Sequence, residues 1–285
     1  MLSVLYLSER QLATFLTSHS IHPTNVRYLI SMGHIISISN QKGGVGKTTT
    51  AVNLSASIAA GDKDCLLIDS DPQGNATTGL GIRPDSLTYG LYDFLLEGIP
   101  FEKAVVQTAL PRLHVLGATR NLIGADVEIA SLPAREFLLR KALTSLKERF
   151  DYIFIDCPPS LGFLTVNALT AAESILIPVQ CEYYALEGLS QLLRTAQAVK
   201  KSLNPTLRIA DIVLTMYDKR NNLSTQVANE ARSLFKNRVF RTVIPRNVRL
   251  SEAPSHGKPV ILYDIRSTGA QSYLSLAKEL IEKEQ

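Results

Sequence analysis

The chain has 285 residues and a mass of 31.3 kDa, which is enough for one large α/β domain or two small ones. Hydrophobic residues make up 45% and charged residues 20%, ordinary values that argue against intrinsic disorder. No apolar run approaches the roughly 18 residues of a membrane-spanning helix, and the N-terminus lacks the basic start of a secretory signal.

The cysteines and the charge distribution indicate what kinds of site and partner the protein can have. Cys65, Cys157 and Cys181 are odd in number and widely spaced, which is typical of reduced cytosolic thiols and does not match a zinc site. The net charge of +4 is uneven, because residues 200–266 carry thirteen Lys and Arg against five Asp and Glu. That segment has a charge of +8, which fits either a polyanion-binding surface or a solvated basic face.

Residues 1–31 are predicted to be an N-terminal extension before a single domain over residues 32–285. A short helix could begin at Ser8, but His22-Pro23 stops it, and no second helix is available to enter a DNA groove. Met32-Gly33 precedes the first strand in the manner of a natural start. We therefore expect a loosely attached, disordered extension or an upstream mis-start, and the alternative is a functional arm.

Residues 34–50, HIISISNQKGGVGKTTT, predict a strand, a glycine-rich loop and a helix. Glycines lack a Cβ, so the backbone N–H groups of the loop can turn inward, and the helix N-terminus adds its positive dipole end. The result is a cradle for phosphates. Lys47 would reach the β- and γ-phosphates, and the Thr48 hydroxyl would ligate Mg²⁺.

The loop departs from the usual pattern G-x-x-x-x-G-K-[ST]. Gln41 stands five residues before Gly46, where the pattern has its first glycine, and Lys42 adds a second lysine near the start of the loop. The alternative is a glycine turn before a helix with two solvated lysines.

A buried strand is predicted over residues 65–69, after a helix over about 46–60. Asp71 follows the carboxyl end of this strand, the edge at which ligands of open α/β sheets bind. Asp71 is therefore our candidate to orient, or accept a proton from, an attacking water. The alternative is an aspartate that only caps the strand end.

The middle of the chain contains a second carboxylate at a strand end. Short helices are predicted over 89–96 and 101–109, a strand over 113–116, and a long amphipathic helix over 133–150. The apolar strand 151–156 then ends in Asp156. This is the Walker B arrangement, in which the carboxylate binds Mg²⁺ directly or through water.

The last third continues the alternation of strands and helices. Strands are predicted over 174–179, 208–214 and 239–243, and helices over 184–202, 222–236 and 268–282. Apolar strands alternating with helices predict an α/β fold, a mostly parallel twisted sheet with helices on both faces. Residues 215–220 and 244–249 follow strand ends and are expected at the nucleotide-binding edge.

Four motifs, KGGVGKTT, LLIDSDPQGNAT, IDCPPS and IPRNVRLSEAPSHGKP, resemble the ParA/Soj family of chromosome- and plasmid-partition ATPases. The likeness covers about residues 32–285, and the loop resembles the deviant Walker A form of the P-loop NTPase fold. It implies weak ATP hydrolysis with Mg²⁺, a sandwich homodimer closed by ATP, and non-specific binding of double-stranded DNA. It also implies release by a ParB-type centromere-binding partner and a cytoplasmic, nucleoid-associated location.

Carried over by position, the resemblance implies roles for single residues. Lys42 would reach the nucleotide of the partner subunit, Lys47 would be the P-loop lysine, and Asp71 the hydrolytic aspartate. Thr48 and Asp156 would hold Mg²⁺, and Arg220 and Arg249 match positions of DNA-contacting arginines. Pro245 falls in the segment that lines the adenine, and Thr49 would lie near the α-phosphate. The nucleotide-binding set is Lys42, Gly43, Gly44, Val45, Gly46, Lys47, Thr48, Thr49 and Pro245.

Three alternatives stay open. A MinD-like division-site ATPase needs a basic amphipathic C-terminal helix for the membrane, whereas residues 277–285 carry three glutamates against two lysines. An iron–sulfur carrier needs closely placed ligand cysteines, and no spacing supports Cys157 and Cys181. An ATP-dependent small-molecule ligase would differ in not requiring DNA retention with ATP.

Overall fold

The structure, a computed structural model, describes residues 33–182 and 187–284. Residues 1–31, for which an extension was predicted, and Tyr184, the predicted start of a helix, lie outside these ranges. The strands are β1 (His34–Ile38), β2 (Cys65–Asp69), β3 (Val105–Gln107), β4 (Leu113–Leu116), β5 (Tyr152–Asp156), β6 (Ser174–Gln180), β7 (Arg208–Tyr217) and β8 (Val239–Pro245).

The helices of the described residues connect these strands. They are α3 (Lys47–Ala59), α4 (Asn75–Gly79), α5 (Leu91–Leu96), α6 (Phe101–Ala104), α7 (Ala125–Ile129), α8 (Leu138–Leu143), α9 (Phe163–Ala171), α10 (Glu187–Ser202), α11 (Asn222–Phe235), α12 (Val248–Glu252), α13 (Val260–Tyr263) and α14 (Thr268–Glu284). Short 3₁₀ turns are η2 (Pro84–Ser86), η3 (Arg120–Gly124), η4 (Arg135–Phe137), η5 (Leu146–Glu148), η6 (Lys236–Arg238) and η7 (Ala253–His256).

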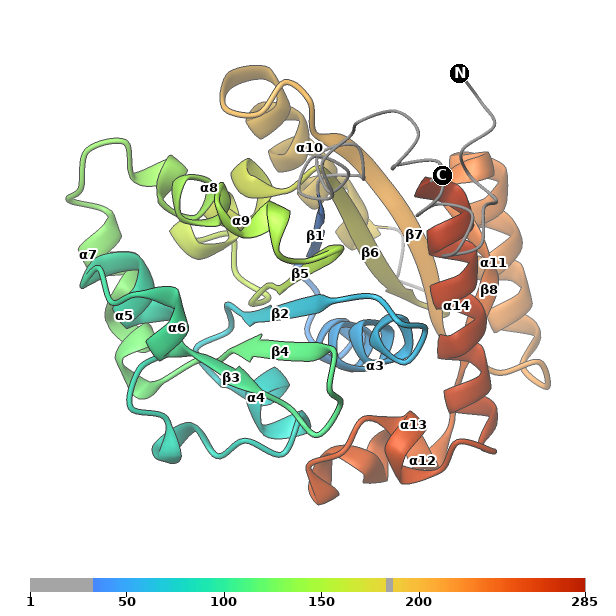
Figure 1. Cartoon of the computed structure of the whole chain (residues 1–285). Coiled ribbons are helices and arrows are strands. Elements are labelled where there is room, and N and C mark those ends of the chain that lie inside the picture. Colours follow the sequence, from blue (N-terminus) through green and yellow to red (C-terminus); the bar gives the residue numbers. More distant parts are fainter. Residues whose placement is uncertain (1–32, 183–186, 285) are drawn as a thin grey trace, which may run out of the picture. The chain divides into compact units, whose positions relative to one another are not determined.

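Within the described residues the strands form one sheet in the order β3-β4-β2-β5-β1-β6-β7-β8. Every neighbouring pair is parallel except β3 and β4. Helices lie on both sides of the sheet: α3, α13 and α14 pack with one hydrophobic cluster, and α5 and α7 to α11 with the other (Figure 1). The predicted α/β fold with a mostly parallel sheet is therefore confirmed.

The three central strands bring the site together. Every residue of β2 and β5 is buried, as expected for apolar strands covered on both faces. The register pairs Asp69 with Asp156, and Ile38 with Asp156, so the carboxyl ends of β1, β2 and β5 meet at one place. The glycine-rich loop leaves β1 at this point.

The long helix predicted over residues 133–150 is wrong. The segment is broken into η4, α8 and η5, and Ala134 has a positive φ of 51°. Two contacts compete with a continuous helix: the Thr144 hydroxyl donates back to the Arg140 carbonyl at 3.0 Å, and the Lys147 carbonyl accepts from the Gly33 N–H at 2.8 Å. The second contact comes from a distant part of the chain, which periodicity cannot reveal.

The helix predicted over residues 101–109 ends early, at Ala104. Val105 and Val106 start β3, which pairs antiparallel with β4, and β-branched residues favour that pairing. The strand predicted over 208–214 instead continues to Tyr217, so Thr215 and Met216 belong to β7. No helix of the described part is long and apolar enough to cross a membrane.

Candidate nucleotide-binding site

The loop between β1 and α3 has the backbone shape of a phosphate cradle. Gly44 and Gly46 have φ angles of 74° and 89°, in the left-handed region that glycine adopts without a steric cost. α3 begins at Lys47, directly after Gly46, so its free N–H groups face the loop. An anion at this position would meet backbone donors and the positive end of the helix dipole.

Buried polar side chains fix the glycine-rich loop through hydrogen bonds. The Asn40 amide donates to the Pro178 carbonyl at 2.7 Å, and its side-chain oxygen accepts from the Lys42 N–H at 3.0 Å. The Thr215 hydroxyl donates to the Val45 carbonyl at 2.8 Å. Asn40 and Thr215 are buried, so these bonds are shielded from water and the cradle is preformed.

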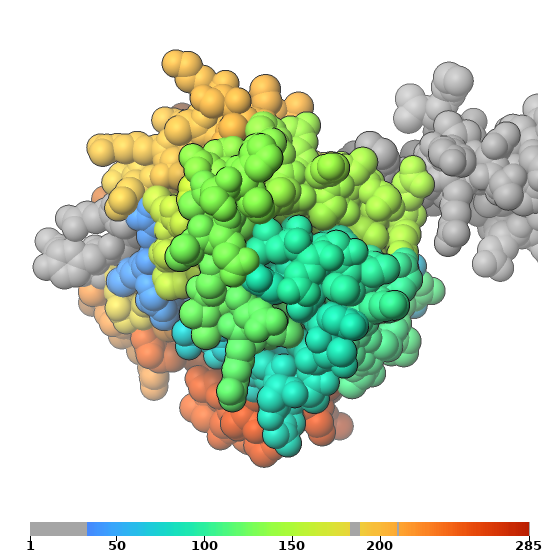
Figure 2. Space-filling view, turned by 90° about the vertical axis from the view of Figure 1, so that its left-hand side faces the viewer, coloured from blue at the N-terminus to red at the C-terminus, as the bar shows by residue number. Residues whose placement is uncertain are grey.

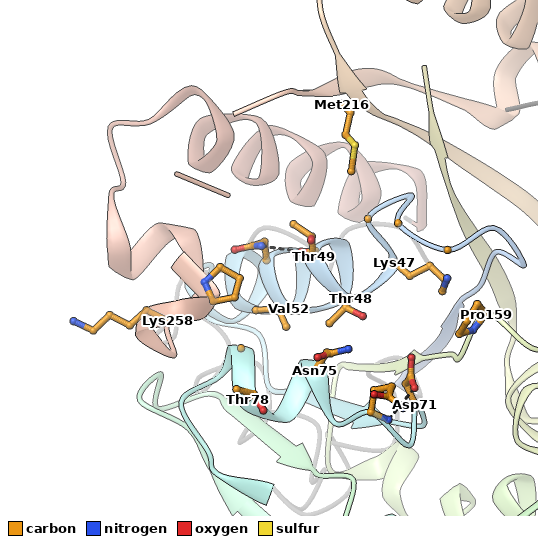
Figure 3. Close-up of a pocket in the computed structure, with 17 residues that line it drawn as sticks. Lys47, Thr48, Thr49, Val52, Asp71, Asn75, Thr78, Pro159, Met216 and Lys258 are labelled. Atoms are coloured by element: carbon orange, nitrogen blue, oxygen red, sulfur yellow. Dashed lines mark hydrogen bonds between the residues drawn. The ribbon is translucent and has the colours of Figure 1, made fainter. Parts of the chain in front are cut away.

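A cavity of about 550 Å³ opens over the loop, large enough for a nucleotide-sized ligand. Figure 3 shows Lys47, Pro159 and Asp71 near one end of it, and Thr78 and Lys258 near the other. Its lining residues are Gly43, Gly44, Gly46, Lys47, Thr48, Thr49, Val52, Asn53, Asp71, Gln73, Asn75, Thr78, Gly79, Pro159, Met216, Pro254 and Lys258.

Lys47 is buried for a lysine, with 7% of its surface exposed. Its ammonium donates to the Lys42 carbonyl at 3.2 Å, which turns the side chain back over the loop. Burial lowers the pKa of Lys47, and the carboxylates of Asp156 and Asp71 oppose this effect. The site therefore holds a poorly solvated cation that a phosphate would stabilise.

Two carboxylates face each other across β2 and β5, and both are fully buried. Asp69 accepts hydrogen bonds from the Thr77 N–H at 2.8 Å, the Thr77 hydroxyl at 2.7 Å and the Asp71 N–H at 3.3 Å. Burial raises the pKa of Asp69 to about 6, and the Thr77 bonds work against that rise. Asp69 thus fixes the loop that carries Asp71.

Asp156 differs from Asp69, because neither of its carboxylate oxygens has a hydrogen-bond partner in the described part of the chain. Burial and the nearby Asp69 raise the pKa of Asp156 well above its ordinary value. The Thr48 hydroxyl lies close enough to oppose this rise without forming a hydrogen bond of good geometry. Buried carboxylate oxygens are normally satisfied, so this group is built for a ligand outside the protein. A carboxylate and a hydroxyl beside a phosphate cradle fit Mg²⁺.

Asp71 lies at the cavity wall with 8% of its surface exposed. One carboxylate oxygen accepts from the Gln73 N–H at 3.0 Å, and the Gly74 N–H donates to the Asp71 carbonyl at 2.9 Å. The second carboxylate oxygen is left for the cavity. This placement suits a group that orients water.

Three residues of the predicted nucleotide-binding set do not line the cavity: Lys42, Val45 and Pro245. Val45 is buried, and its carbonyl accepts the Thr215 hydrogen bond. Pro245 ends β8 opposite Tyr217. Lys42 is half-buried and contributes its backbone carbonyl, not its side chain, to the contact with Lys47.

Several lining residues escaped the sequence prediction, among them Asn53, Met216 and Lys258. Asn53 sits one helical turn after Thr49, a periodicity that could have placed it on the same face of α3. Met216 has a positive φ of 51°, and Lys258 follows a 3₁₀ turn, so neither carries a local signal.

The two predicted DNA-contacting arginines lie on the surface and already have carboxylate partners. Arg220, with 85% of its side chain exposed, donates to both carboxylate oxygens of Asp218 at 3.1 and 3.0 Å. Arg249 pairs with Glu252 at 2.8 Å and with Asp264 at 3.4 Å. Exposed ion pairs are weak, so a phosphate can replace these carboxylates.

The cysteines are free and buried. The Cys157 sulfur lies 3.3 Å from the Ser37 hydroxyl, and burial raises the pKa of the thiol to about 11. Cys157 therefore carries no charge beside Asp156 at neutral pH.

Residues 33–209 match the family described as "AAA domain". The chain is 56% identical over 254 residues to the chromosome partitioning protein ParA of Myxococcus xanthus, covering 89% of this chain and 90% of the relative. It is 57% identical over 249 residues to the sporulation initiation inhibitor protein Soj of Bacillus subtilis, covering 87% and 98%.

A similar solved structure is cobyrinic acid a,c-diamide synthase from Mycobacterium smegmatis with bound ADP and magnesium. It has a TM-score of 0.78 and 35% identity, with 89% of this chain and 96% of that chain covered. The sequence identity to ParA and Soj extends over most of both chains. The phosphate cradle beside two strand-end carboxylates agrees with this similarity. The chain belongs to the ParA/Soj family of chromosome-partitioning proteins.

Proposed function

We propose that the protein is a partition ATPase that binds ATP and Mg²⁺ in the cavity over the glycine-rich loop. The observation that carries this proposal is the pair of unpartnered Asp156 oxygens beside Thr48 and the loop. Thr48 and Asp156 would hold Mg²⁺, which would neutralise phosphate charge when bound. Lys47 and the loop N–H groups would hold the phosphates.

Asp71 is the residue that would act on water. Its carboxylate lines the same cavity as Lys47 and is fixed by the Gln73 N–H. It would orient the attacking water or accept its proton. We propose that intrinsic turnover is low, because no arginine finger is evident in the motifs, and that a ParB-type partner stimulates it.

Lys42 would act across a homodimer. Its side chain does not line its own cavity and forms no ion pair within residues 33–182 and 187–284. In a sandwich dimer it would reach the phosphates held by the other subunit. Two triphosphates pressed between two subunits need such positive charge, so the dimer would depend on ATP.

The dimer would then bind double-stranded DNA without sequence preference, which would place the protein on the nucleoid. The basic segment 200–266 supports this, and Arg220 and Arg249 are exposed within it. Each phosphate contact makes the slope of log affinity against log salt about 0.9 more negative. A dimer doubles the contacts, so one subunit alone would bind weakly.

The test is retention of the full-length protein on duplex DNA at low salt with no nucleotide, ADP or ATP, each with Mg²⁺. We expect retention with ATP alone, and faster phosphate release when the cognate centromere-binding protein is added. The variant Asp71→Ala should stay on DNA with ATP and release little phosphate. Equal retention in all three nucleotide states would refute the partition cycle, and normal turnover by Asp71→Ala would remove its catalytic role.

A ligase acting on a small carboxylic acid remains the second candidate, because the similar solved structure is named as a diamide synthase. The same retention assay separates the two. A ligase has no need for ATP-dependent DNA binding, whereas a partition ATPase cannot work without it.

A further inference from the structure

The cavity wall opposite Asp71 comes from two segments far apart in the sequence. Thr78 and Gly79 lie at the end of α4, which follows the Asp71 loop, and Pro254 and Lys258 lie in and just after η7. Figure 3 shows Thr78 and Lys258 near this end of the cavity. Since η7 directly follows α12, which carries Arg249, one wall joins the nucleotide site to the basic segment.

The two segments touch through a pair of glycines. Gly81 and Gly257 have φ angles of 83° and 60°. A Cβ on Gly81 would lie 2.7 Å from the Gly257 carbonyl oxygen, and a Cβ on Gly257 would lie 2.7 Å from the Gly81 Cα. Both obstacles are backbone atoms, so the two backbones are in direct contact and neither can shift toward the other.

A buried asparagine makes a second connection. Asn53, with 3% of its surface exposed, donates from its amide to the Thr49 carbonyl at 2.8 Å. Its side-chain oxygen accepts from the Val260 N–H at 2.7 Å. The first turns of α3, which would hold the phosphates, are thereby bonded to the start of α13, just after Lys258.

The segment that both connections reach, residues 248–264, is held together internally. Arg249 pairs with Glu252 at 2.8 Å and Asp264 at 3.4 Å, and the Tyr263 hydroxyl donates to Glu252 at 3.2 Å. The rings of His256 and Tyr263 stack with centroids 4.9 Å apart. α12, η7 and α13 therefore form one small unit, and Arg249 is fixed to it. In Figure 2 this orange-red unit meets the blue-green segment after α4 at the bottom of the face shown.

We propose that residues 253–258 are a relay between nucleotide and DNA within each subunit. A shift of α4 and the Asp71 loop would move this segment through the Gly81–Gly257 contact. A shift of the phosphate-binding turn would move it through Asn53. Together they set where the unit that carries Arg249 lies. The proposal rests on the proposed function, and it adds that DNA affinity depends on nucleotide by a route other than dimerisation.

The test uses full-length Gly257→Ala and Gly81→Ala, which force the glycine contact apart from either side and change no residue that lines the cavity. Dimer formation with ATP and Mg²⁺ is measured by sedimentation, and duplex affinity by titration with ATP under conditions where each variant is fully dimeric. The relay predicts dimers like those of the wild type, with DNA affinity reduced about tenfold, within the usual range of coupling between sites.

Gly98→Ala is the matched control. Gly98 also has a positive φ, 67°, but no atom lies within 4 Å of a Cβ placed there. It therefore carries the same backbone strain without the contact, and it should bind DNA like the wild type. Thermal melting of all variants reports whether each is folded.

Full DNA affinity in dimeric Gly257→Ala and Gly81→Ala would overturn the relay, as would loss of the ATP-dependent dimer in both. An equal loss of DNA affinity in Gly98→Ala would also overturn it, because strain alone would then explain the effect. If the wild-type protein shows no ATP-dependent DNA binding, the proposed function fails before any variant is compared.

Discussion

At the scale of single residues, the chemistry is concentrated in three buried charges: Lys47, Asp69 and Asp156. Burying a charge is costly, so each needs a partner or a ligand. Asp69 has its partners in Thr77 and the Asp71 N–H, whereas the Asp156 oxygens have none in the described residues. This difference separates a carboxylate that shapes the loop from one that is free to bind a metal ion.

Asp69 makes stability depend on pH. Its pKa in the folded protein is about 6, above the ordinary 3.8, so the folded state binds the proton more tightly than the unfolded state. The stabilisation is full below pH 3.8 and is lost as pH rises through 6. Relative to Asp69→Asn, which carries no charge, the wild type should lose about 3 kcal/mol across this window.

Urea unfolding without nucleotide or Mg²⁺, at several values between pH 4.5 and 7, measures this difference between the two proteins. The asparagine variant should gain relative stability as the pH rises. A constant difference across the range would show that burial does not perturb Asp69.

Most residues of the phosphate cradle could be predicted, because Gly43 to Thr49 are contiguous and their spacing alone encodes the loop. Lys258 could not, because its place in the wall depends on η7 packing against α4. Asp69 was passed over because an aspartate at the end of an apolar strand gives no sign of its bonds to Thr77.

At the scale of elements, strands were easier to predict than helices. β2 and β4 lie at the predicted residues. A short apolar run between turn-forming residues predicts a buried strand when strands and helices alternate along the chain. The segment 133–150 has helical periodicity but meets partners outside itself, such as Gly33 at Lys147. Local pattern therefore predicted the apolar strands but not β3, which the predicted helix 101–109 covered, and tertiary contacts decided where helices break.

One helix start depends on a side chain from another element. The N-cap residue of α9, Gly162, has no side chain, and Asp126 of α7 accepts from the Leu164 N–H at 2.9 Å. Asp126→Ala should therefore cost about 1 kcal/mol of unfolding free energy, as for loss of a helix cap.

Asp85→Ala is the comparison. Within residues 33–182 and 187–284, Asp85 forms an ion pair only with the exposed Arg83, so its loss should cost less than about 0.5 kcal/mol. Urea unfolding at pH 7 measures both. Equal costs for the two variants would rule out a capping role for Asp126.

At the scale of the whole molecule, positive charge is concentrated at one end of the sheet. The segment 200–266 contributes β7, α11, β8 and α12, so its basic residues gather on one end of the sheet order. Arg220 and Arg249 lie after the carboxyl ends of β7 and β8, the same edge as the nucleotide cavity. A subunit would therefore present the two arginines proposed to bind DNA and the nucleotide on one side.

Arg220→Glu and Arg249→Glu should each weaken duplex binding with ATP while ATP binding is unchanged. Two contacts are lost per dimer, so the slope of log affinity against log salt should become less steep by about 1.8. Each change removes one phosphate contact per subunit and adds repulsion. Fluorescence anisotropy with labelled duplex across a salt series measures affinity and slope together.

Arg112→Glu serves as the control, because Arg112 also pairs with two carboxylates, Asp62 and Asp64, but lies before β4 at the opposite edge. It should bind DNA like the wild type. Loss of ATP binding in the Arg220 or Arg249 variant would indicate a folding defect, and full DNA affinity would take that arginine off the DNA surface.

Lys42 is proposed to join two subunits through ATP. The most direct measurement is sedimentation of the wild type and Lys42→Ala with ADP and with ATP, both with Mg²⁺. The claim predicts that the wild type sediments as a dimer with ATP and as a monomer of 31.3 kDa with ADP, and that Lys42→Ala binds ATP but stays monomeric. A wild type that stays monomeric with ATP, or a Lys42→Ala protein that dimerises as readily, would contradict it.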